Sequence, residues 1–368
     1  MQYTCHSERS EESSRPSAPP VLRRLKRSLA TLGMTVLLAI ALIPAARADD
    51  GKLYLYIWDT YADKTLFDKF EKETGIQVVT DIYSSMETLL AKLQSGAAYD
   101  IVAPTGNYVP LLASENLLLP LPDELRPLGA KMSDAVKNPS YDVDYQYVLP
   151  LFWGTTSLAV NTKLTKEDVT SWRQFFERPE AEGKTLGVLD DISTVMNIVS
   201  VAAGKNFCDP TPDTLKTLQA MLIKQKPFVK VYGADGYSER LASNEVTMQM
   251  AWSGDVYRAR KDNPALKYVY PKEGVEVWVD NFAIPAASKN VESAAKFIAF
   301  IMKPENMAEY AQYAGMVPSI EAAKPLLPAS FRNAPEFNIP DGIKGPLSTN
   351  CPPRVVKNYN KIWQRLLR

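Results

Sequence analysis

Short apolar runs alternate with helix-like periodicity from residue 52 onward, and this alternation constrains the fold more than any other feature. The pattern predicts strands at 53–58, 76–83 and 99–104, and helices at 65–75 and 86–96. Gly75 marks the expected end of the first helix, and Ser84 with Glu87 has the spacing of a capping box before the second. Repeated strand–helix–strand units favour an α/β fold with a mostly parallel sheet and helices on both faces.

A second set of such units follows later in the chain. It predicts strands at 185–190, 228–232 and 246–252, helices at 194–203 and 212–226, two helices separated at Pro304, and a closing amphipathic helix at 354–368. The roughly 320 residues after a leader exceed what one core usually holds, so two lobes are expected. Ligands of open α/β folds bind at the carboxyl ends of the strands, which predicts a cleft between the lobes.

The first 48 residues resemble a secretory signal. Basic residues at 23–27 precede an apolar run from Leu32 to Ile43, and Ala46-Arg47-Ala48 forms a cleavage site. The apolar run is shorter than the ~20 residues that a membrane span needs. We therefore expect an exported, periplasmic protein that is cleaved near Ala48.

Cleavage of the leader during export would remove residues that matter for catalysis and for net charge. The single histidine, His6, would leave with the leader, which excludes Ser-His-Asp and Cys-His nucleophiles in the mature protein. The chain has 42 Lys and Arg against 42 Asp and Glu, of which the leader holds seven and three, so the mature net charge is −4. Such a charge disfavours a nucleic-acid partner, and no motif indicates a cofactor or a metal.

Two cysteines remain after the leader, Cys208 in NFCDPTP and Cys351 in STNCPPR. An even pair in loop-like sequence in an oxidising compartment predicts a disulfide. The alternative is two buried free thiols.

Aromatic and acidic side chains recur together at predicted strand ends and on a predicted strand face. Trp58 with Asp59 and Trp252 with Asp255 lie where strands are predicted to end, and Asp191 ends another strand. Trp278 and Asp280 alternate along a strand in VEVWVDNFAIP, which places them on one face. An aromatic face attracts a cation, and a carboxylate accepts charge-assisted hydrogen bonds from an ammonium. A single pair is better explained by core packing and helix capping. The recurrence of the pairs instead predicts a slot for a thin aliphatic chain with charged ends.

Five stretches carry a family resemblance: YIWDTYADKTLFDKFEKETGIQV, YDIVAPTGNYV, LPLFWGTTSLAVNT, MAWSGDVYRA and YPKEGVEVWVDNFAIPAASKN. Together they resemble the polyamine-binding (spermidine and putrescine) periplasmic proteins of ABC importers. The resemblance implies a two-lobed, type II periplasmic-binding-protein-like fold that closes on a ligand in the cleft. It also implies a membrane permease as partner.

The resemblance extends to individual residues. It implies ligand contacts from Trp58, Asp59, Thr60, Tyr61, Thr105, Asp191, Trp252, Asp255, Trp278 and Asp280. Asp280 is expected to be the main anchor of an amine, with Trp278 as its platform. Two positions depart from the family: Thr194 stands where a Glu is frequent, and Met316 stands where a Tyr aligns. One end of the slot is therefore expected to lack a carboxylate.

We accordingly predict a monomeric, non-catalytic binding protein for putrescine or spermidine. The first lobe is expected to comprise residues 49–155 plus 280–315, and the second 156–279 plus 316–368, with connecting strands near 150–161 and 270–283. A polyamine sensor would use the same pocket. A carbohydrate-active enzyme would also pair aromatics with carboxylates, and an iron(III)-binding protein would need clustered tyrosines, for which Tyr310 and Tyr313 are weak candidates.

Overall fold

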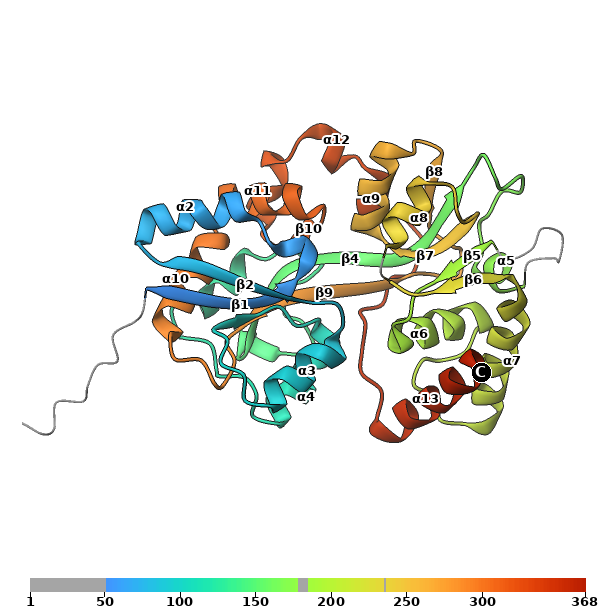
Figure 1. Cartoon of the computed structure of the whole chain (residues 1–368), viewed down its shortest axis with the longest axis horizontal. Coiled ribbons are helices and arrows are strands. Elements are labelled where there is room, and N and C mark those ends of the chain that lie inside the picture. Colours follow the sequence, from blue (N-terminus) through green and yellow to red (C-terminus); the bar gives the residue numbers. More distant parts are fainter. Residues whose placement is uncertain (1–50, 178–184, 235) are drawn as a thin grey trace, which may run out of the picture. The chain divides into compact units, whose positions relative to one another are not determined.

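The computed structural model describes residues 51–177, 185–234 and 236–368 (Figure 1). The predicted signal, residues 1–48, lies outside the described residues. The strands are β1 (Lys52–Trp58), β2 (Gln77–Tyr83), β3 (Ile101–Val102), β4 (Val148–Asn161), β5 (Leu186–Val188), β6 (Val229–Tyr232), β7 (Met248–Trp252), β8 (Leu266–Val269), β9 (Glu276–Ala283) and β10 (Val317–Pro318).

One sheet runs through the described unit in the order β2-β1-β3-β9-β4-β7-β5-β6, with β8 and β10 both pairing with β4. Strand β1 is parallel to β2 and β3, and β5 is parallel to β6 and β7. The long strands β4 and β9 are antiparallel to each other and connect these two parallel groups (Figure 1). The chain therefore crosses between two α/β lobes on strands, as predicted.

Helices cover both faces of each parallel group (Figure 1). They are α2 (Lys64–Thr74), α3 (Met86–Gln94), α4 (Val109–Ser114), α5 (Trp172–Phe176), α6 (Ile192–Ala203), α7 (Pro212–Gln225), α8 (Tyr237–Ala242), α9 (Ser253–Asp262), α10 (Val291–Ile301), α11 (Pro304–Ala314), α12 (Ala329–Arg332) and α13 (Pro353–Leu367). Within the described part of the chain, no helix combines the length and the apolar character needed to cross a membrane.

Local signals place most of these boundaries correctly. Gly75 ends α2 in the left-handed conformation with φ of 75°, and Pro304 begins α11, where its missing N–H costs nothing. The predicted capping box was wrong by one residue, because Ser85 rather than Ser84 accepts the hydrogen bond from the Thr88 N–H. The strand predicted at 99–104 is only two residues long.

The short β3 has a local cause in the sequence around Pro104. The carbonyl of Ala103 accepts hydrogen bonds from the Trp58 indole at 3.1 Å and from the Tyr83 hydroxyl at 2.5 Å, instead of a neighbouring strand. Proline cannot donate to a ladder. The chain therefore leaves the sheet here, and it does so at the edge where the candidate site lies.

Alternation along β1 organises the first lobe. Leu53, Leu55 and Ile57 face a core shared with α2, α10 and α11, whereas Tyr56 faces a smaller core shared with α3 and α4. The second lobe has its own core around α5, α6, α7, α9 and α13, with Trp172 fully buried. Two separate cores joined by crossing strands leave room for a ligand between them.

The predicted disulfide between Cys208 and Cys351 is confirmed. Their Cα atoms are 5.1 Å apart, within the range that a disulfide requires, and the two residues are 143 positions apart in the chain. Cys351 packs against the core of the second lobe immediately before α13. The bridge therefore fastens the C-terminal segment to the loop that precedes α7.

Replacing both cysteines by serine should lower the free energy of unfolding by about 3–5 kcal/mol, because an open loop of this length gains conformational entropy in the unfolded chain. Urea denaturation of the oxidised, the reduced and the doubly substituted protein measures the change. The reduced and the doubly substituted protein should have the same urea midpoint, below that of the oxidised protein. If neither midpoint differs from that of the oxidised protein, the disulfide does not stabilise the fold.

Candidate ligand-binding site

A cavity of about 850 Å³ opens where the strands of the two lobes end. This is within the ~300–1,000 Å³ typical of small-molecule sites. Every residue that the sequence singled out contributes to its wall: Trp58, Asp59, Thr60, Tyr61, Thr105, Asp191, Thr194, Trp252, Asp255, Trp278, Asp280 and Met316. The structure thus brings all twelve together, and their roles in binding stay predictions.

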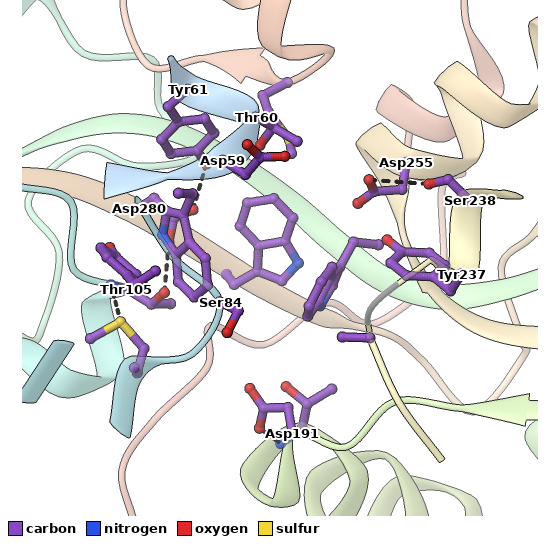
Figure 2. Close-up of a pocket in the computed structure, with 18 of the residues that line it drawn as sticks. Asp59, Thr60, Tyr61, Ser84, Thr105, Asp191, Tyr237, Ser238, Asp255 and Asp280 are labelled. Atoms are coloured by element: carbon purple, nitrogen blue, oxygen red, sulfur yellow. Dashed lines mark hydrogen bonds between the residues drawn. The ribbon is translucent and has the colours of Figure 1, made fainter. Parts of the chain in front are cut away.

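Asp280 is the most tightly held carboxylate in the wall. Its two oxygens accept hydrogen bonds from the Tyr61 hydroxyl at 2.5 Å and the Thr105 hydroxyl at 2.6 Å (Figure 2). Tyr61 comes from the turn after β1 and Thr105 from the turn after β3, so the carboxyl ends of two first-lobe strands fix one side chain of β9. Asp280 is 6% exposed.

Burial raises the pKa of Asp280 to about 6, although the hydrogen bonds from Thr105 and Tyr61 act in the opposite direction. Burial and the adjacent Asp280 carboxylate raise the pKa of Tyr61 well above its usual value, so Tyr61 remains a donor. At neutral pH Asp280 is therefore an ionised carboxylate, and no ion pair in the described part of the chain includes it. A ligand ammonium is the complement that such a group requires.

Trp278 lies two residues before Asp280 on the same face of β9 and is 8% exposed. It is paired with Gly154 of β4, and a Cβ atom at that glycine would lie 2.5 Å from the Trp278 ring. The glycine of the FWGTT segment is therefore needed for the indole to lie against β4. This packing holds the ring as a rigid platform in the wall of the cavity.

The Trp252 and Asp255 pair sits where β7 leads into α9. The Trp252 ring packs edge-on against Tyr237 at 5.7 Å between centroids. Asp255, in the first turn of α9, forms an ion pair with Arg258, so its charge is already balanced within the protein. Sequence reasoning did not anticipate this arginine, which also lines the cavity.

Met316 and Gly254 explain how the two lobes meet at this wall. A Cβ atom at Gly254 would lie 2.5 Å from the Gly315 carbonyl oxygen and 2.7 Å from the Met316 sulfur. The glycine of the W-x-G-D motif therefore permits close approach of the start of α9 to the segment after α11. Met316 is buried in the core of the first lobe.

Asp191 and Thr194 form the second-lobe end of the cavity. Asp191 caps α6 by accepting the Thr194 N–H at 2.9 Å, while its carboxylate remains accessible from the open cavity. Partial enclosure by the cavity walls raises the pKa of Asp191 above its usual value, and the nearby charge of Glu276 contributes to the increase. Asp191 thus caps a helix and also lines the cavity, so helix capping and a ligand contact do not exclude each other at this residue.

The sequence interpretation missed several wall residues, mainly from turns and short helices. They include Tyr83, Ser84, Met86, Asn107, Tyr108, Tyr237, Ser238, Glu239, Arg258, Asp262 and Ser348. Figure 2 shows Asp280, Asp191 and Asp255 at separate positions around the cavity, with Tyr237 and Ser238 beside Asp255. A tyrosine or serine in a turn carries no distinctive pattern, so no sequence signal would have separated these from other loop residues.

A family model for bacterial extracellular solute-binding proteins matches residues 65–339. The chain belongs to this family. Among described residues no group of three or more His, Cys, Asp or Glu side chains is arranged to hold a metal ion.

Individual relatives of the solute-binding protein are similar over most of their length. The spermidine/putrescine-binding periplasmic protein 1 of Haemophilus influenzae is 33% identical over 79% of this chain and 81% of its own. The spermidine/putrescine-binding periplasmic protein of Escherichia coli is 30% identical over 89% and 95%. The solved structure of PotD, the substrate-binding protein of a spermidine/putrescine ABC transporter from Streptococcus pneumoniae, superposes with a TM-score of 0.75 at 27% identity, covering 86% of this chain and 98% of that one.

The raised pKa of Asp280 predicts a stability difference that depends on pH. A native carboxyl pKa near 6, against about 3.9 when unfolded, favours the folded state at low pH, and this contribution is lost as pH rises from about 4 to 6. Asp280→Asn removes the titration. Between about pH 4.5 and pH 7.5 the unfolding free energy of the ligand-free variant should therefore gain about 2 kcal/mol relative to wild type.

Urea denaturation of both proteins at the two pH values measures this double difference, in which the pH-independent effect of the substitution cancels. An equal difference at both pH values would show that Asp280 titrates normally.

Proposed function

We propose that this protein captures a polyamine, putrescine or spermidine, in the periplasm and delivers it to the membrane permease of an ABC transporter. It does so without catalysing a reaction on the ligand. Relatives named for binding spermidine and putrescine, similar over most of both chains, support the proposal. Membership of a solute-binding family supports a binding role rather than an enzymatic one.

The observation that carries the proposal is the charge of the cavity wall. Among the described lining residues, six carboxylates face one arginine, Arg258, together with three tryptophans; the carboxylates are those of Asp59, Asp191, Glu239, Asp255, Asp262 and Asp280. Neutral sugars and amino acids need no such excess of negative charge. A short aliphatic chain with several ammonium groups matches both the carboxylates and the aromatic faces.

Within this site, Asp280 anchors one ammonium, because it is buried, ionised and without a cation. Trp278 and Trp252 contact the methylene groups, with Trp58 and Tyr61 closing the first-lobe side. Asp191 faces the ligand from the second lobe. Asp255 contributes less than the sequence suggested, because Arg258 already neutralises it.

Within the described residues, the lobes divide at the crossing strands, with residues 51–155 and 280–315 in the first lobe and most of the rest in the second. The core clusters refine the last boundary. Met316, Ile320 and Phe331 pack in the core of the first lobe, whereas Val355 and Trp363 of α13 pack in that of the second. We therefore place the final crossing after Phe331 rather than at residue 315.

The protein acts as a monomer that is exported by its N-terminal signal and cleaved near Ala48. Its relatives from Haemophilus influenzae and Escherichia coli are named as periplasmic proteins, which supports this location. The disulfide between Cys208 and Cys351 supports it as well, since disulfides persist in oxidising compartments.

Calorimetric titration of the mature protein with putrescine, cadaverine, spermidine and spermine tests the proposal. At least one should bind with a stoichiometry of about one, since the site is one cavity between two lobes. Asp280→Asn should weaken binding by about 2 kcal/mol or more, because it removes a charge-assisted bond and leaves the ammonium unpaired.

The matched control is Asp100→Asn. Asp100 is also a buried first-lobe carboxylate, hydrogen-bonded to Ser288 and Asn290, but it does not line the cavity. This variant should bind as wild type does. Absence of heat with all four polyamines, in protein shown to be folded, would refute the proposed function.

Ligand should also close the lobes, because contacts from both lobes to one polyamine form fully only when the cavity narrows. Small-angle scattering should therefore show a smaller radius of gyration with a saturating polyamine than without it. Asp280→Asn at the same ligand concentration serves as the unclosed control. Identical scattering curves for saturated and free wild-type protein would exclude closure on the ligand.

A further inference from the structure

A fully buried carboxylate lies directly behind the second-lobe end of the cavity. Glu276, at the start of β9, is 1% exposed and does not line the cavity itself. Its oxygens accept four hydrogen bonds, from the Thr156, Thr194 and Ser348 hydroxyls at 3.1, 2.9 and 2.9 Å and from the Asn197 amide at 3.0 Å. These donors come from β4, α6 and the segment before α13.

All four of these donors are neutral. No ion pair of the described residues includes Glu276. Glu336, the other glutamate buried to 1% exposure, is paired with Arg260, with a distance of 3.0 Å between Nη2 and Oε2. A buried carboxylate without a cation is costly unless something else needs its charge, which distinguishes Glu276 from Glu336.

Two of the donors to Glu276 also face the cavity. Thr194 and Ser348 are among the lining residues, and each directs its hydroxyl hydrogen to the Glu276 carboxylate. A hydroxyl has one hydrogen and two lone pairs. Because both hydroxyls donate their hydrogen to Glu276, they have only lone pairs left for a ligand. They can therefore accept hydrogen bonds from a donor group of the ligand, but they cannot donate to an acceptor group.

We propose that Glu276 is a positioning residue that makes the second-lobe end of the cavity specific for an ammonium. It acts through Thr194 and Ser348, whose hydroxyls it orients as acceptors, and its own negative charge lies behind them. The family resemblance implies a carboxylate at position 194, where this chain has Thr194. Glu276 supplies a carboxylate instead, and it lies behind Thr194 rather than in the cavity wall. This inference rests on the proposed polyamine function and specifies how the second amine is recognised.

The geometry of β9 supports this assignment. Residues 276, 278 and 280 share one face of the strand, so Glu276 and Asp280 flank Trp278 at a Cα separation of about 13 Å. A chain lying across the Trp278 ring therefore has one end at Asp280 and the other toward Thr194 and Ser348. Removal of the charge at 276 should affect ligands that have an amine at both ends.

The test compares putrescine with butylamine, which has the same carbon chain but one ammonium. Glu276→Gln keeps the size of the side chain, yet its new amide hydrogens reverse the direction of two of the hydrogen bonds. Putrescine affinity should fall by about tenfold or more, while butylamine affinity, measured by competition, should change by less than about threefold. The selectivity ratio is the readout, because general damage to the fold would weaken both ligands equally.

Two further variants separate charge from structure. Glu276→Asp retains the charge but shortens the side chain, so it should keep more of the selectivity for putrescine than Glu276→Gln does. Glu273→Gln is the matched control, since Glu273 is another hydrogen-bonded carboxylate in the same lobe, bonded to the Trp172 N–H at 3.1 Å and remote from the cavity lining. It should leave both affinities unchanged.

If Glu276→Gln does not fold, the combined Thr194→Val and Ser348→Ala variant provides the test, because it removes the two oriented hydroxyls and should lower the same ratio. An unchanged ratio of putrescine to butylamine in Glu276→Gln, or in the combined variant, overturns the role of Glu276. A wild-type protein that binds no polyamine would instead overturn the proposed function.

Discussion

Two carboxylates on one buried strand, neither of them in an ion pair among the described residues, are the physical constraint on which the rest of this structure depends. Asp280 and Glu276 on β9 are 6% and 1% exposed, and each is held by neutral hydrogen-bond donors. Such an arrangement lowers the stability of the ligand-free protein. This loss of stability is explained if the site binds a cationic ligand. The same unpaired charges that destabilise the ligand-free protein would then attract the ligand.

The strands that carry these charges also connect the lobes. Because β9 and β4 cross from one parallel group to the other, Asp280 is fixed by first-lobe turns while Glu276 is fixed by α6 of the second lobe. Gly154 lets the Trp278 ring rest between them against β4. The two carboxylates on this strand are therefore held by different lobes, on either side of the Trp278 ring.

The third acidic position is treated differently. Asp255 lies in the first turn of α9 and is neutralised by Arg258, which also donates to the carbonyl of Ala314, the last residue of α11. This ion pair bridges the second lobe to the end of α11 at the wall where Gly254 meets Met316. Asp255 thus takes part in the contact between the lobes, whereas Asp280 presents an unpaired charge to the cavity. The difference between these two aspartates comes from the side chains around them.

Local patterns in the sequence were sufficient for much of this description. The 2-residue and 3.6-residue periodicities, Gly75 and Pro304 located the main strands and helices, because such signals act within one or two turns of the chain. Trp58, Asp59, Trp252 and Asp191 were all found in one cavity because they lie at or just after the carboxyl ends of parallel strands. Trp278 and Asp280 reach the same cavity because they share one face of β9, which is antiparallel to β3 and β4. The cysteine pair was predicted by count and compartment alone.

The sequence could not show how the charges are balanced. The hydroxyls that hold Asp280 belong to Tyr61 and Thr105, 219 and 175 positions away in the chain. The donors that surround Glu276 are 72 to 120 positions away from it. Arg258 differs, because it follows Asp255 by three residues on one helix, which is a local pattern that the sequence interpretation overlooked. In the sequence, Glu276 has no feature that distinguishes it from other strand residues. Its environment is evident only from the folded chain, in which Thr194, Asn197 and Ser348 donate hydrogen bonds to it. The sequence by itself therefore determined which groups reach the cleft, whereas only the tertiary structure decided which of their charges stay unpaired, because pairing and desolvation depend on distances that no local pattern encodes.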